Sequence, residues 1–402
     1  MLNSVSMEGR RPVMENRDAL GLFCLDSELG NPICGGVEKL ACSMGRLCFS
    51  TAPVMNHLLL DPFNSLGRGK FSGCDGGYVH QSFSSFQNVR GQLISLAQAD
   101  QRLLGKTEVI QKILWQVKDH LCHLMMDHQC SYLIQTIIQF STVNQATTIL
   151  AFLLRNDHML KQVCMHIHGT RAFQTLLENL KTHEQISMAI FAIKRITVRL
   201  SKTINGGYVI QHCLKLFSPD ITQFILDEVA KNCVEVASDK SGCSVYQKCL
   251  HHAQGDAKRR LIEEIVSSAL VLAEHPYGNY VVQYVIKMKM HQINATIISR
   301  LRGKYVQLSM NKHASNVVED LLEFSEERDA AIIVQEIMYN RNFLGILQDP
   351  YGNYVIQRAL KSCKGSLNKT LSSSILSNYG HLHSHLYGKR VLAFVKGRKI
   401  CV

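Results

Sequence analysis

The chain has 402 residues, of which 46% are hydrophobic and 19% charged, so it is long and apolar enough to bury a large core. Residues 1–90 contain eight Lys or Arg and eight Asp or Glu, so the whole net charge of +12 lies in residues 91–402. A basic surface of this kind favours a polyanionic partner such as nucleic acid. No run of 18 apolar residues and no apolar leader is present, so we expect neither a membrane span nor a secretory signal.

The first 88 residues have a composition unlike the remainder. They contain four of the seven prolines, and helical periodicity is interrupted throughout. Such a segment does not favour a regular helix array. We expect residues 1–88 to be a flexible, disordered tail and residues 89–402 to be a folded domain.

The cysteine and histidine patterns do not predict a metal site. Fourteen cysteines are scattered along the chain without a CxxC pair, and the single CxxH pair, Cys249 and His252, has no second pair to complete a zinc site. The alternating His381, His383 and His385 have no carboxylate or thiol partner at a suitable spacing. We therefore expect no metal, no cofactor and a reducing intracellular compartment, in which Cys213 and Cys233 act as small apolar side chains.

A nine-residue motif recurs through the rest of the chain. It is Asp-Pro-Tyr-Gly-Asn-Tyr-Val-Ile-Gln at residues 349–357 and His-Pro-Tyr-Gly-Asn-Tyr-Val-Val-Gln at 275–283, with weaker copies before and after. Recurrence of a motif at a period of 36 to 39 residues predicts a stacked repeat array rather than one globular core. Residues 93–126 resemble an eroded first unit with its motif near Asp100. The residues equivalent to Asn353 follow one another at intervals of 36 to 39 and are Ser131, Thr170, Gly207, Cys243, Asn279, Ser315, Asn353 and Lys389.

The repeats have helical rather than strand periodicity. Ile293, Ile297 and Leu301 recur at i, i+4 and i+8, which predicts an amphipathic helix, and a short apolar turn and the motif follow it. We number the motif from the residue equivalent to Asn353. Positions one and five then lie on one helix face, whereas the apolar pair at positions three and four faces the stack. The fold class expected is an all-α solenoid of about eight repeats.

Three consecutive motifs give the array a specific resemblance. Asn-Tyr-Val-Val-Gln at 279–283, Ser-Asn-Val-Val-Glu at 315–319 and Asn-Tyr-Val-Ile-Gln at 353–357 resemble repeats of the Pumilio, or PUF, family of RNA-binding proteins, and the resemblance covers residues 90–402. It implies a right-handed, monomeric superhelix of a plant-type member with a degenerate first repeat. The unit at Lys389 resembles the family's non-reading C-terminal cap. In this family each repeat reads one unpaired base with two or three side chains.

The resemblance assigns positions one and five to the edge of a base and position two to stacking. Because RNA runs antiparallel to the protein in this family, the C-terminal units would contact 5′-UGUA. An ionised Glu319 accepts both donors of the guanine edge, whereas adenine presents an acceptor there. The implied pairs are Asn353 and Gln357 for uracil, Ser315 and Glu319 for guanine, Asn279 and Gln283 for uracil, and Cys243 and Gln247 for adenine, with Tyr354, Asn316 and Tyr280 as stacking residues.

The N-terminal units depart from the family pattern. Gly207 has no side chain, which leaves Gln211 and the stacking residue Tyr208, and Ser244 offers no ring beside Cys243. The resemblance implies an adenine preference for the other two pairs and a site 5′-UGUA-N-A-A with loose specificity in its last three positions. These pairs are Thr170 with Gln174, stacked by Arg171, and Ser131 with Gln135, stacked by Tyr132.

Each of these residues also has a plain structural interpretation. Asn279 is of the type that caps helix N-termini, and Tyr280 is compatible with ordinary packing. A polar side chain at position five in seven successive units favours base contact over that interpretation. Five histidines are interpreted as surface or turn residues rather than ligands: His166, His168, His251, His252 and His385.

The implied function is sequence-specific binding of single-stranded mRNA in 3′ untranslated regions, with control of translation and mRNA stability in the cytoplasm, or alternatively in the nucleus or nucleolus. The protein would recruit deadenylation or translation-repression factors or block access. No phosphate-binding Gly-rich motif, nucleophile elbow or carboxylate pair predicts an enzyme. Two alternatives stay open: a protein-binding helical scaffold, and a nucleolar relative that binds RNA without a strict base code.

Overall fold

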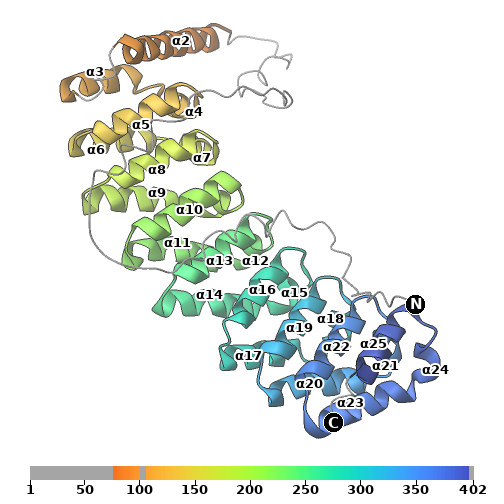
Figure 1. The fold of residues 1–402 in the computed structure, drawn as a ribbon. Helices are drawn as coiled ribbons and strands as arrows, with labels where there is room; N and C mark the ends of the chain where they lie inside the picture. Colours follow the sequence, from red (N-terminus) through yellow and green to blue (C-terminus); the bar gives the residue numbers. More distant parts are fainter. Residues whose placement is uncertain (1–75, 100–105, 398–402) are drawn as a thin grey trace, which may run out of the picture. The chain divides into compact units, whose positions relative to one another are not determined.

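The computed structural model describes residues 76–99 and 106–397, and every regular element within these ranges is an α-helix. The predicted all-α solenoid is therefore confirmed. Residues 81–402 form one compact unit in which the helices stack in chain order (Figure 1). None of the described helices is long and apolar enough to cross a membrane. The tail expected at residues 1–88 lies, up to residue 75, outside the described residues.

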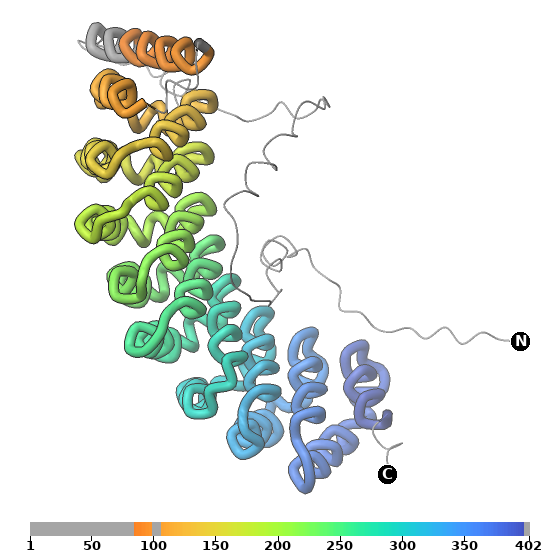
Figure 2. The backbone as a smooth tube through the Cα atoms, turned by 60° about the vertical axis from the view of Figure 1, so that its left-hand side comes forward, coloured from red at the N-terminus to blue at the C-terminus, as the bar shows by residue number. Residues whose placement is uncertain are grey.

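One row of helices, the outer helices, follows the outside of the curved stack (Figure 2). From the second to the last, successive outer helices pack against each other. They are α3 (Thr107–Val117), α6 (Val143–Leu153), α9 (His183–Ser201), α11 (Pro219–Lys231), α14 (Gly255–Ser267), α17 (His291–Leu301), α20 (Glu327–Met338) and α23 (Gly365–Ser377).

A second row, the inner helices, carries the recurring motif, and its successive members also pack against each other. They are α5 (Cys130–Phe140), α8 (Gly169–Asn179), α10 (Ile204–Leu216), α13 (Gly242–His252), α16 (Gly278–Lys287), α19 (Ala314–Phe324), α22 (Gly352–Ser362) and α25 (Leu386–Gly397). Short helices join the two rows, except where the 19-residue α9 extends up to the loop before α10. They are α4 (Leu121–Met126), α7 (Asp157–Met165), α12 (Cys233–Ala237), α15 (Ala269–Glu274), α18 (Tyr305–Met310), α21 (Phe343–Leu347) and α24 (Tyr379–Leu382).

Two outer helices show how neighbouring repeats are joined. Thr142 and Thr182 begin α6 and α9 as N-caps with capping boxes, in which Gln145 and Gln185 complete the reciprocal hydrogen bonds. The same two amides also reach the preceding outer helix. Gln145 Nε2 donates to the carbonyl of Thr107 at 2.8 Å, and Gln185 Nε2 donates to that of Val143 at 2.9 Å. Each of the two buried glutamines thus completes the cap of its own helix and fixes the stacking of its repeat on the preceding one.

The apolar pairs at positions three and four form the floor beneath the inner helices. Val281 and Val282 in α16, and Val355 and Ile356 in α22, are fully buried. Burying each such side chain stabilises the fold by roughly 1.5–3 kcal/mol relative to exposure. This confirms the predicted orientation, which leaves positions two and five toward the exposed side of each inner helix.

The N-terminal end of the array begins earlier than residue 89. Helix α2 (Gly76–Ala99) buries Phe86 and Leu93, and Arg90 Nε forms an ion pair with Asp127 at 2.9 Å. The expected boundary therefore falls inside a helix. Apolar side chains of α2 pack into the same core as the first repeat, which the interrupted periodicity before residue 88 did not reveal. The eroded motif expected near Asp100 lies in residues 100–105, outside the described residues.

The described cysteines behave as apolar side chains. Cys213 and Cys249 are fully buried, and burial raises the pKa of both thiols to about 12. Burial likewise raises the pKa of Cys233 to about 11. Thiols with such high pKa values stay protonated near neutral pH and are poor nucleophiles. These residues therefore fill the core, as the sequence predicts.

Candidate RNA interface

The residue four before position one sets the start of each inner helix. Before α22, Asp349 Oδ1 accepts hydrogen bonds from the backbone N–H groups of Tyr351 and Gly352, both at 2.8 Å. Such bonds satisfy helix N-terminal donors that have no intrahelical partner. The equivalent acceptors in other units are Asp127, His166, Thr203, Asp239, His275, Asn311 and His385. The loops therefore place position one within the first turn of the helix in every unit.

These bonds revise two interpretations from the sequence. The capping role considered for Asn279 belongs to His275, whose Nδ1 accepts from the N–H groups of Tyr277 and Gly278 at 3.2 and 3.3 Å. Asn279 is instead the second residue of α16. His166 and His385 are turn residues with a specific role. The Nδ1 atom of each accepts a backbone N–H in the loop before its inner helix. The signal that sequence reasoning missed is the alternation of Asp, Asn, Thr and His at this position.

Glycine directly before position one allows a close backbone approach. A Cβ atom on Gly242 would lie 2.1 Å from the carbonyl oxygen of Val236, and one on Gly352 would lie 2.6 Å from that of Ile346. Real Cβ atoms do not approach so closely, so glycine at these two positions lets the short helix pack closely against the inner helix. Cys130 and Ala314 occupy the equivalent position in α5 and α19.

Position one is buried in every described unit that has a side chain there, except the last. We expected both readers to project from one face, but position one is 6% exposed or less in six units, whereas Lys389 of the last unit is exposed. The six buried residues are Ser131, Thr170, Cys243, Asn279, Ser315 and Asn353. Position five lies over it. Its residue is half-buried in six units and is Gln135, Gln174, Gln211, Gln247, Gln283 or Gln357, whereas Glu319 is 8% exposed. A base approaching from solvent thus meets position five first.

In α16 and α22 the asparagine at position one orients the glutamine at position five. Asn353 Nδ2 donates to the carbonyls of Asp349 and Pro350 at 2.8 and 2.9 Å. Its Oδ1 accepts from Gln357 Nε2 at 3.1 Å, which leaves Gln357 Oε1 and one N–H for a ligand. Asn279 makes the same bonds, with Gln283 Nε2 at 2.8 Å. One acceptor beside one donor matches the N3–H and a carbonyl oxygen of uracil.

The units nearer the N-terminus use other supports. Thr170 Oγ1 donates to the carbonyl of Asn205 and accepts from Gln174 Nε2, both at 3.1 Å, so Thr170 holds its glutamine much as asparagine does. Gln135 Nε2 donates instead to the main-chain carbonyl of Ser131. Cys243 Sγ contacts the carbonyl of Lys240 at 3.3 Å. These units therefore do not share one side-chain arrangement.

Gly207 could not be replaced without a change in its neighbour. A Cβ atom there would lie 3.0 Å from Val245 Cγ2 of the next inner helix. Gln211, at position five of α10, therefore has no position-one side chain beside it. Tyr208 remains, with 42% of its surface exposed.

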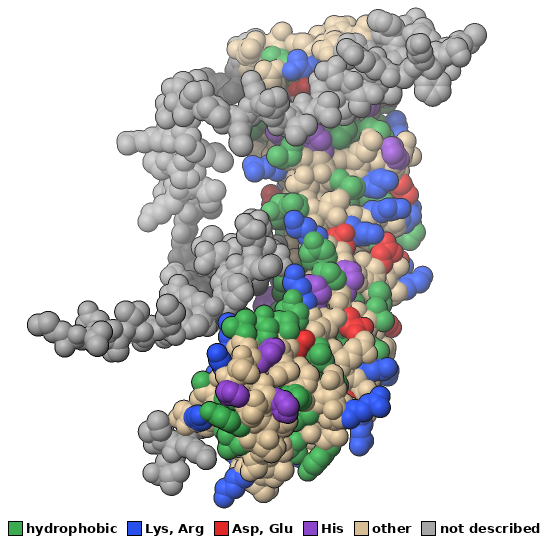
Figure 3. All heavy atoms as spheres, turned by 90° about the vertical axis from the view of Figure 1, so that its right-hand side faces the viewer, with side chains coloured by type: hydrophobic (Ala, Val, Ile, Leu, Met, Phe, Trp, Pro, Cys, Tyr) green, Lys and Arg blue, Asp and Glu red, His purple; other side chains and the backbone are tan. Residues whose placement is uncertain are grey.

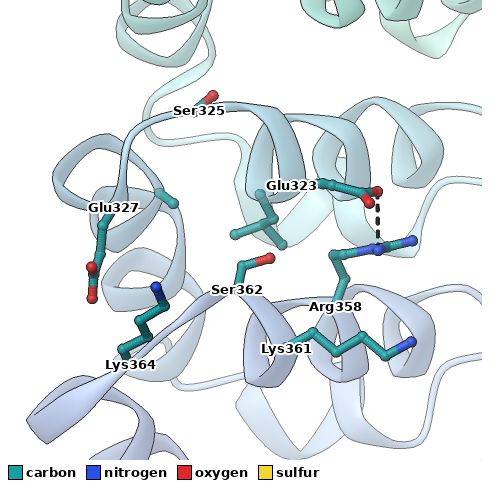
Figure 4. Close-up of a pocket in the computed structure, with 9 residues that line it drawn as sticks. Glu323, Ser325, Glu327, Arg358, Lys361, Ser362 and Lys364 are labelled. Carbon is teal, nitrogen blue, oxygen red and sulfur yellow. Dashed lines mark ion pairs between the residues drawn. The ribbon is translucent and has the colours of Figure 1, made fainter. Parts of the chain in front are cut away.

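Glu319 lies beside a basic residue of the following repeat. Arg358 Nε is 3.9 Å from Glu319 Oε2, and its NH1 group is 3.0 Å from Glu323 Oε2 (Figure 4). The pair with Glu323 lies at the edge of a surface cavity that Lys361 and Lys364 also line. The guanidinium of Arg358 therefore lies within ion-pair distance of Glu319 and closer to Glu323.

The position-two side chains differ in exposure along the array. Tyr132 is 66% exposed and Arg171 is exposed, whereas Tyr280, Asn316 and Tyr354 are half-buried. Arg390 of α25 donates to the hydroxyl of Tyr354 at 3.1 Å. The last unit thus contacts the position-two residue of α22. Its own position five is the exposed Ala393, which fits the expected C-terminal cap without a base-reading pair.

Histidines recur along one side of the array (Figure 3). Among the described residues, no group of three or more His, Cys, Asp or Glu side chains is placed to hold a metal ion. His128 and His168 instead pack edge to face with ring centroids 5.2 Å apart, and His166 lies 5.6 Å from His168.

The motif arrangement matches known proteins. The Pumilio-family RNA binding repeat matches six segments that contain inner helices α8 to α22: residues 161–192, 197–230, 232–266, 269–288, 304–338 and 342–376. Pumilio homolog 9 of Arabidopsis thaliana is 36% identical to this chain over 408 residues, which cover 96% of the chain and 70% of that protein. The chain belongs to the Pumilio family. The six matched segments are therefore Pumilio-family RNA binding repeats.

Other relatives agree with this assignment. Pumilio homolog 12 of Arabidopsis thaliana is 36% identical over 327 residues, which cover 79% of the chain and 55% of that relative, so the chain spans little more than half of its length. The solved structure of the Puf4 RNA binding domain bound to HO endonuclease RNA 3′ UTR recognition sequence is 29% identical. It covers 77% of this chain and 95% of that domain with a TM-score of 0.61.

Proposed function

We propose that this Pumilio-family protein binds single-stranded mRNA at 5′-UGUA elements in 3′ untranslated regions and regulates translation and mRNA stability in the cytoplasm. The observation that carries the proposal is the succession of α16, α19 and α22. Their position-five residues, Gln283, Glu319 and Gln357, lie over buried position-one residues in the order expected for U, G and U. The Puf4 domain bound to a 3′ UTR recognition sequence supports the class of ligand.

The chemistry of each unit supports this order. In α22 and α16 the anchored glutamine offers one acceptor and one donor, which suits uracil. In α19 two carboxylate oxygens suit the two donors of guanine, and Arg358 lies within ion-pair distance of them. Each neighbouring ring or amide at position two would stack between bases, and such stacking contributes about 1–3 kcal/mol per base.

The proposed cellular role follows from binding without chemistry. A protein that covers an RNA element changes that RNA's fate by blocking access or by bringing other factors to it. We propose deadenylation or translation-repression factors as the recruited partners, and a monomer as the binding unit. The basic net charge of residues 91–402 would strengthen association with RNA at low salt.

Selection of random RNA on the full chain, read by sequencing, tests the proposal. We expect enrichment of UGUA followed by a weaker preference for adenine. Fluorescence anisotropy with a short UGUA oligonucleotide and a shuffled oligonucleotide of the same composition gives the matched comparison. Equal affinity for the two oligonucleotides at moderate salt would reject base-specific recognition by these helices.

A further inference from the structure

The outer helices of the N-terminal half expose aromatic side chains that the inner face does not use. Phe191 in α9 is 61% exposed, Phe224 in α11 is 52% exposed and Trp115 in α3 is 60% exposed. By contrast, none of the large hydrophobic side chains exposed in the described region belongs to α14, α17, α20 or α23. The outer helices of the N-terminal half therefore expose aromatic side chains, whereas those of the C-terminal half do not.

The exposed rings are linked to one another through basic side chains. Arg195 lies over the ring of Phe191 at 5.4 Å, and Lys194 of the same helix lies over Phe224 of the next at 5.4 Å. Phe152, at the end of the preceding outer helix α6, is half-buried, and Arg155 in the turn after that helix lies over its ring at 4.6 Å. We call the six residues of these pairs the outer strip: Phe152, Arg155, Phe191, Lys194, Arg195 and Phe224.

The outer strip spans three neighbouring outer helices and is positively charged. Lys194 joins α9 to α11 through its contact with Phe224, and Arg195 forms an ion pair with Asp157, which is two residues beyond Arg155 in the chain. The strip itself contains three cations, and Asp157 is the acidic residue paired with it. An exposed surface rich in aromatic residues and arginine has the composition of the centre of a protein interface. Single exposed rings are ordinary, but the two exposed rings of the strip lie on neighbouring helices beneath basic side chains of α9 and together form a patch.

We propose that the outer strip binds an acidic segment of another protein that carries apolar anchor side chains. Carboxylates would pair with Arg155 and Lys194, and the anchors would pack against the exposed parts of Phe191 and Phe224 that the basic side chains leave uncovered. Rings on successive outer helices are separated by the spacing of packed helices, about 8–10 Å. Two turns of a helical partner advance by roughly the same distance, about 10.5 Å, so one anchor every seven residues fits the row.

Two other occupants fit less well. Stacking of RNA bases needs free ring faces, but basic side chains already lie over the faces of Phe152, Phe191 and Phe224. Residues 1–90 of this chain hold equal numbers of acidic and basic side chains, so charge does not favour that segment as the occupant. The proposal is independent of RNA recognition, because the strip lies on outer helices and contains no base-reading residue.

The test is a selection of displayed random 16-residue peptides on the full chain. Peptides that bind are then measured against a variant with Phe191→Gln and Phe224→Gln. We expect the enriched peptides to be acidic, to carry apolar residues at regular spacing, and to bind the variant at least tenfold more weakly. Tyr339→Gln is the matched control, since Tyr339 is 74% exposed outside the strip and its loss should leave peptide binding unchanged.

A charge reversal makes the test independent of the aromatic substitutions. Arg155→Glu with Lys194→Glu should weaken the acidic peptides and allow peptides with Lys in place of Asp and Glu to bind. Circular dichroism and binding of UGUA RNA report whether each variant keeps its fold. The proposal would be overturned if the enriched peptides bound both variants as tightly as the natural chain. It would also be overturned if an RNA without UGUA bound in a way that depends on the outer strip.

Discussion

The inner helices of the C-terminal and N-terminal halves follow loops of the same kind, but they support the position-five side chain differently. In α16 and α22 an asparagine fixed by two backbone carbonyls holds the glutamine, and in α19 Arg358 of the next repeat lies beside Glu319. In α5 the glutamine bonds to the main chain, and α10 has no side chain at position one. Thr170 in α8 is the N-terminal position with a comparable side-chain support.

This difference distinguishes the residues that position the backbone of each unit from the residues that would set its base preference. The capping acceptor four residues before position one recurs in both halves, so the backbone presents every unit in the same way. The base preference depends instead on the hydrogen-bonding groups that the pair leaves free. The C-terminal units should therefore discriminate between bases, whereas α5 and α10 should mainly add affinity. The predictions that follow test this contrast.

The largest expected effect is a change of base preference in α19. Ser315→Asn with Glu319→Gln recreates the pair of α16 and α22, so the second base should change from guanine to uracil. Each mismatch should cost about 1–3 kcal/mol, by analogy with DNA sites. Dissociation constants for UGUA and UUUA oligonucleotides measure the change, and a double variant that still prefers guanine would disprove the assignment of this unit.

The same type of exchange should change RNA affinity and base preference less in the N-terminal half. Thr170→Asn creates with Gln174 the pair found in α16 and α22, so the loose adenine preference implied for this unit should move toward uracil, with a smaller change in affinity than in α19. Comparison of the two exchanges on one set of oligonucleotides separates a true difference between the halves from a general loss of binding.

Removal of the position-one anchor should destabilise α22 more than α5. Asn353→Ala removes the side-chain donor to the carbonyls of Asp349 and Pro350 and frees Gln357, at a cost of about 0.5–1.5 kcal/mol for each hydrogen bond lost. Ser131→Ala should cost less, because Gln135 bonds to the main-chain carbonyl that the substitution retains. Urea unfolding of both variants measures the difference, and equal losses would contradict the proposed role of Asn353.

The capping acceptors should give a smaller and more uniform effect. Asp349→Ala removes bonds to two N–H groups before α22, and Thr203→Ala removes one before α10. Loss of a helix N-terminal cap costs about 0.5–2 kcal/mol. Thermal unfolding should rank Asp349→Ala above Thr203→Ala, with Asp349→Asn as the control that keeps the acceptor.

Much of the fold could be predicted from the sequence because the period is strong. The interval of 36 to 39 residues and the buried apolar pair at positions three and four indicated both the array and its core face. The start of the array was not predictable in the same way. Helix α2 buries Phe86 and Leu93, but it lacks the motif and so gave no periodic signal.

The site was predictable in its spacing but not in its depth. The i, i+4 rule placed positions one and five on one face, yet the burial of Asn279 and Asn353 depends on the short helix packed before them. Arg358 was also missed, because it acts across a repeat boundary and its partner Glu319 is 39 residues earlier in the chain. Contacts between repeats leave no local pattern in one sequence.

The smallest expected effect is a pH dependence that arises mainly in the N-terminal half. Burial lowers the pKa of His166 below its usual 6.5, and the neighbouring His168 adds to the shift. The pKa of His168 is lowered by burial and by His128 and Arg171. Because the unfolded chain binds these protons more readily, stability should be complete above pH 6.5 and should decrease as the pH falls below it.

The capping bond gives this effect a local cause that a variant can isolate. His166 Nδ1 accepts the N–H of His168 at 3.2 Å, and a protonated imidazole has no acceptor for it. His166→Asn keeps an acceptor of the kind that Asn311 provides before α19 and does not titrate. Thermal unfolding at pH 7.5 and pH 5.5 should therefore show a smaller decrease for the variant than for the natural chain. An unchanged decrease would place the pH sensitivity outside the loop before α8.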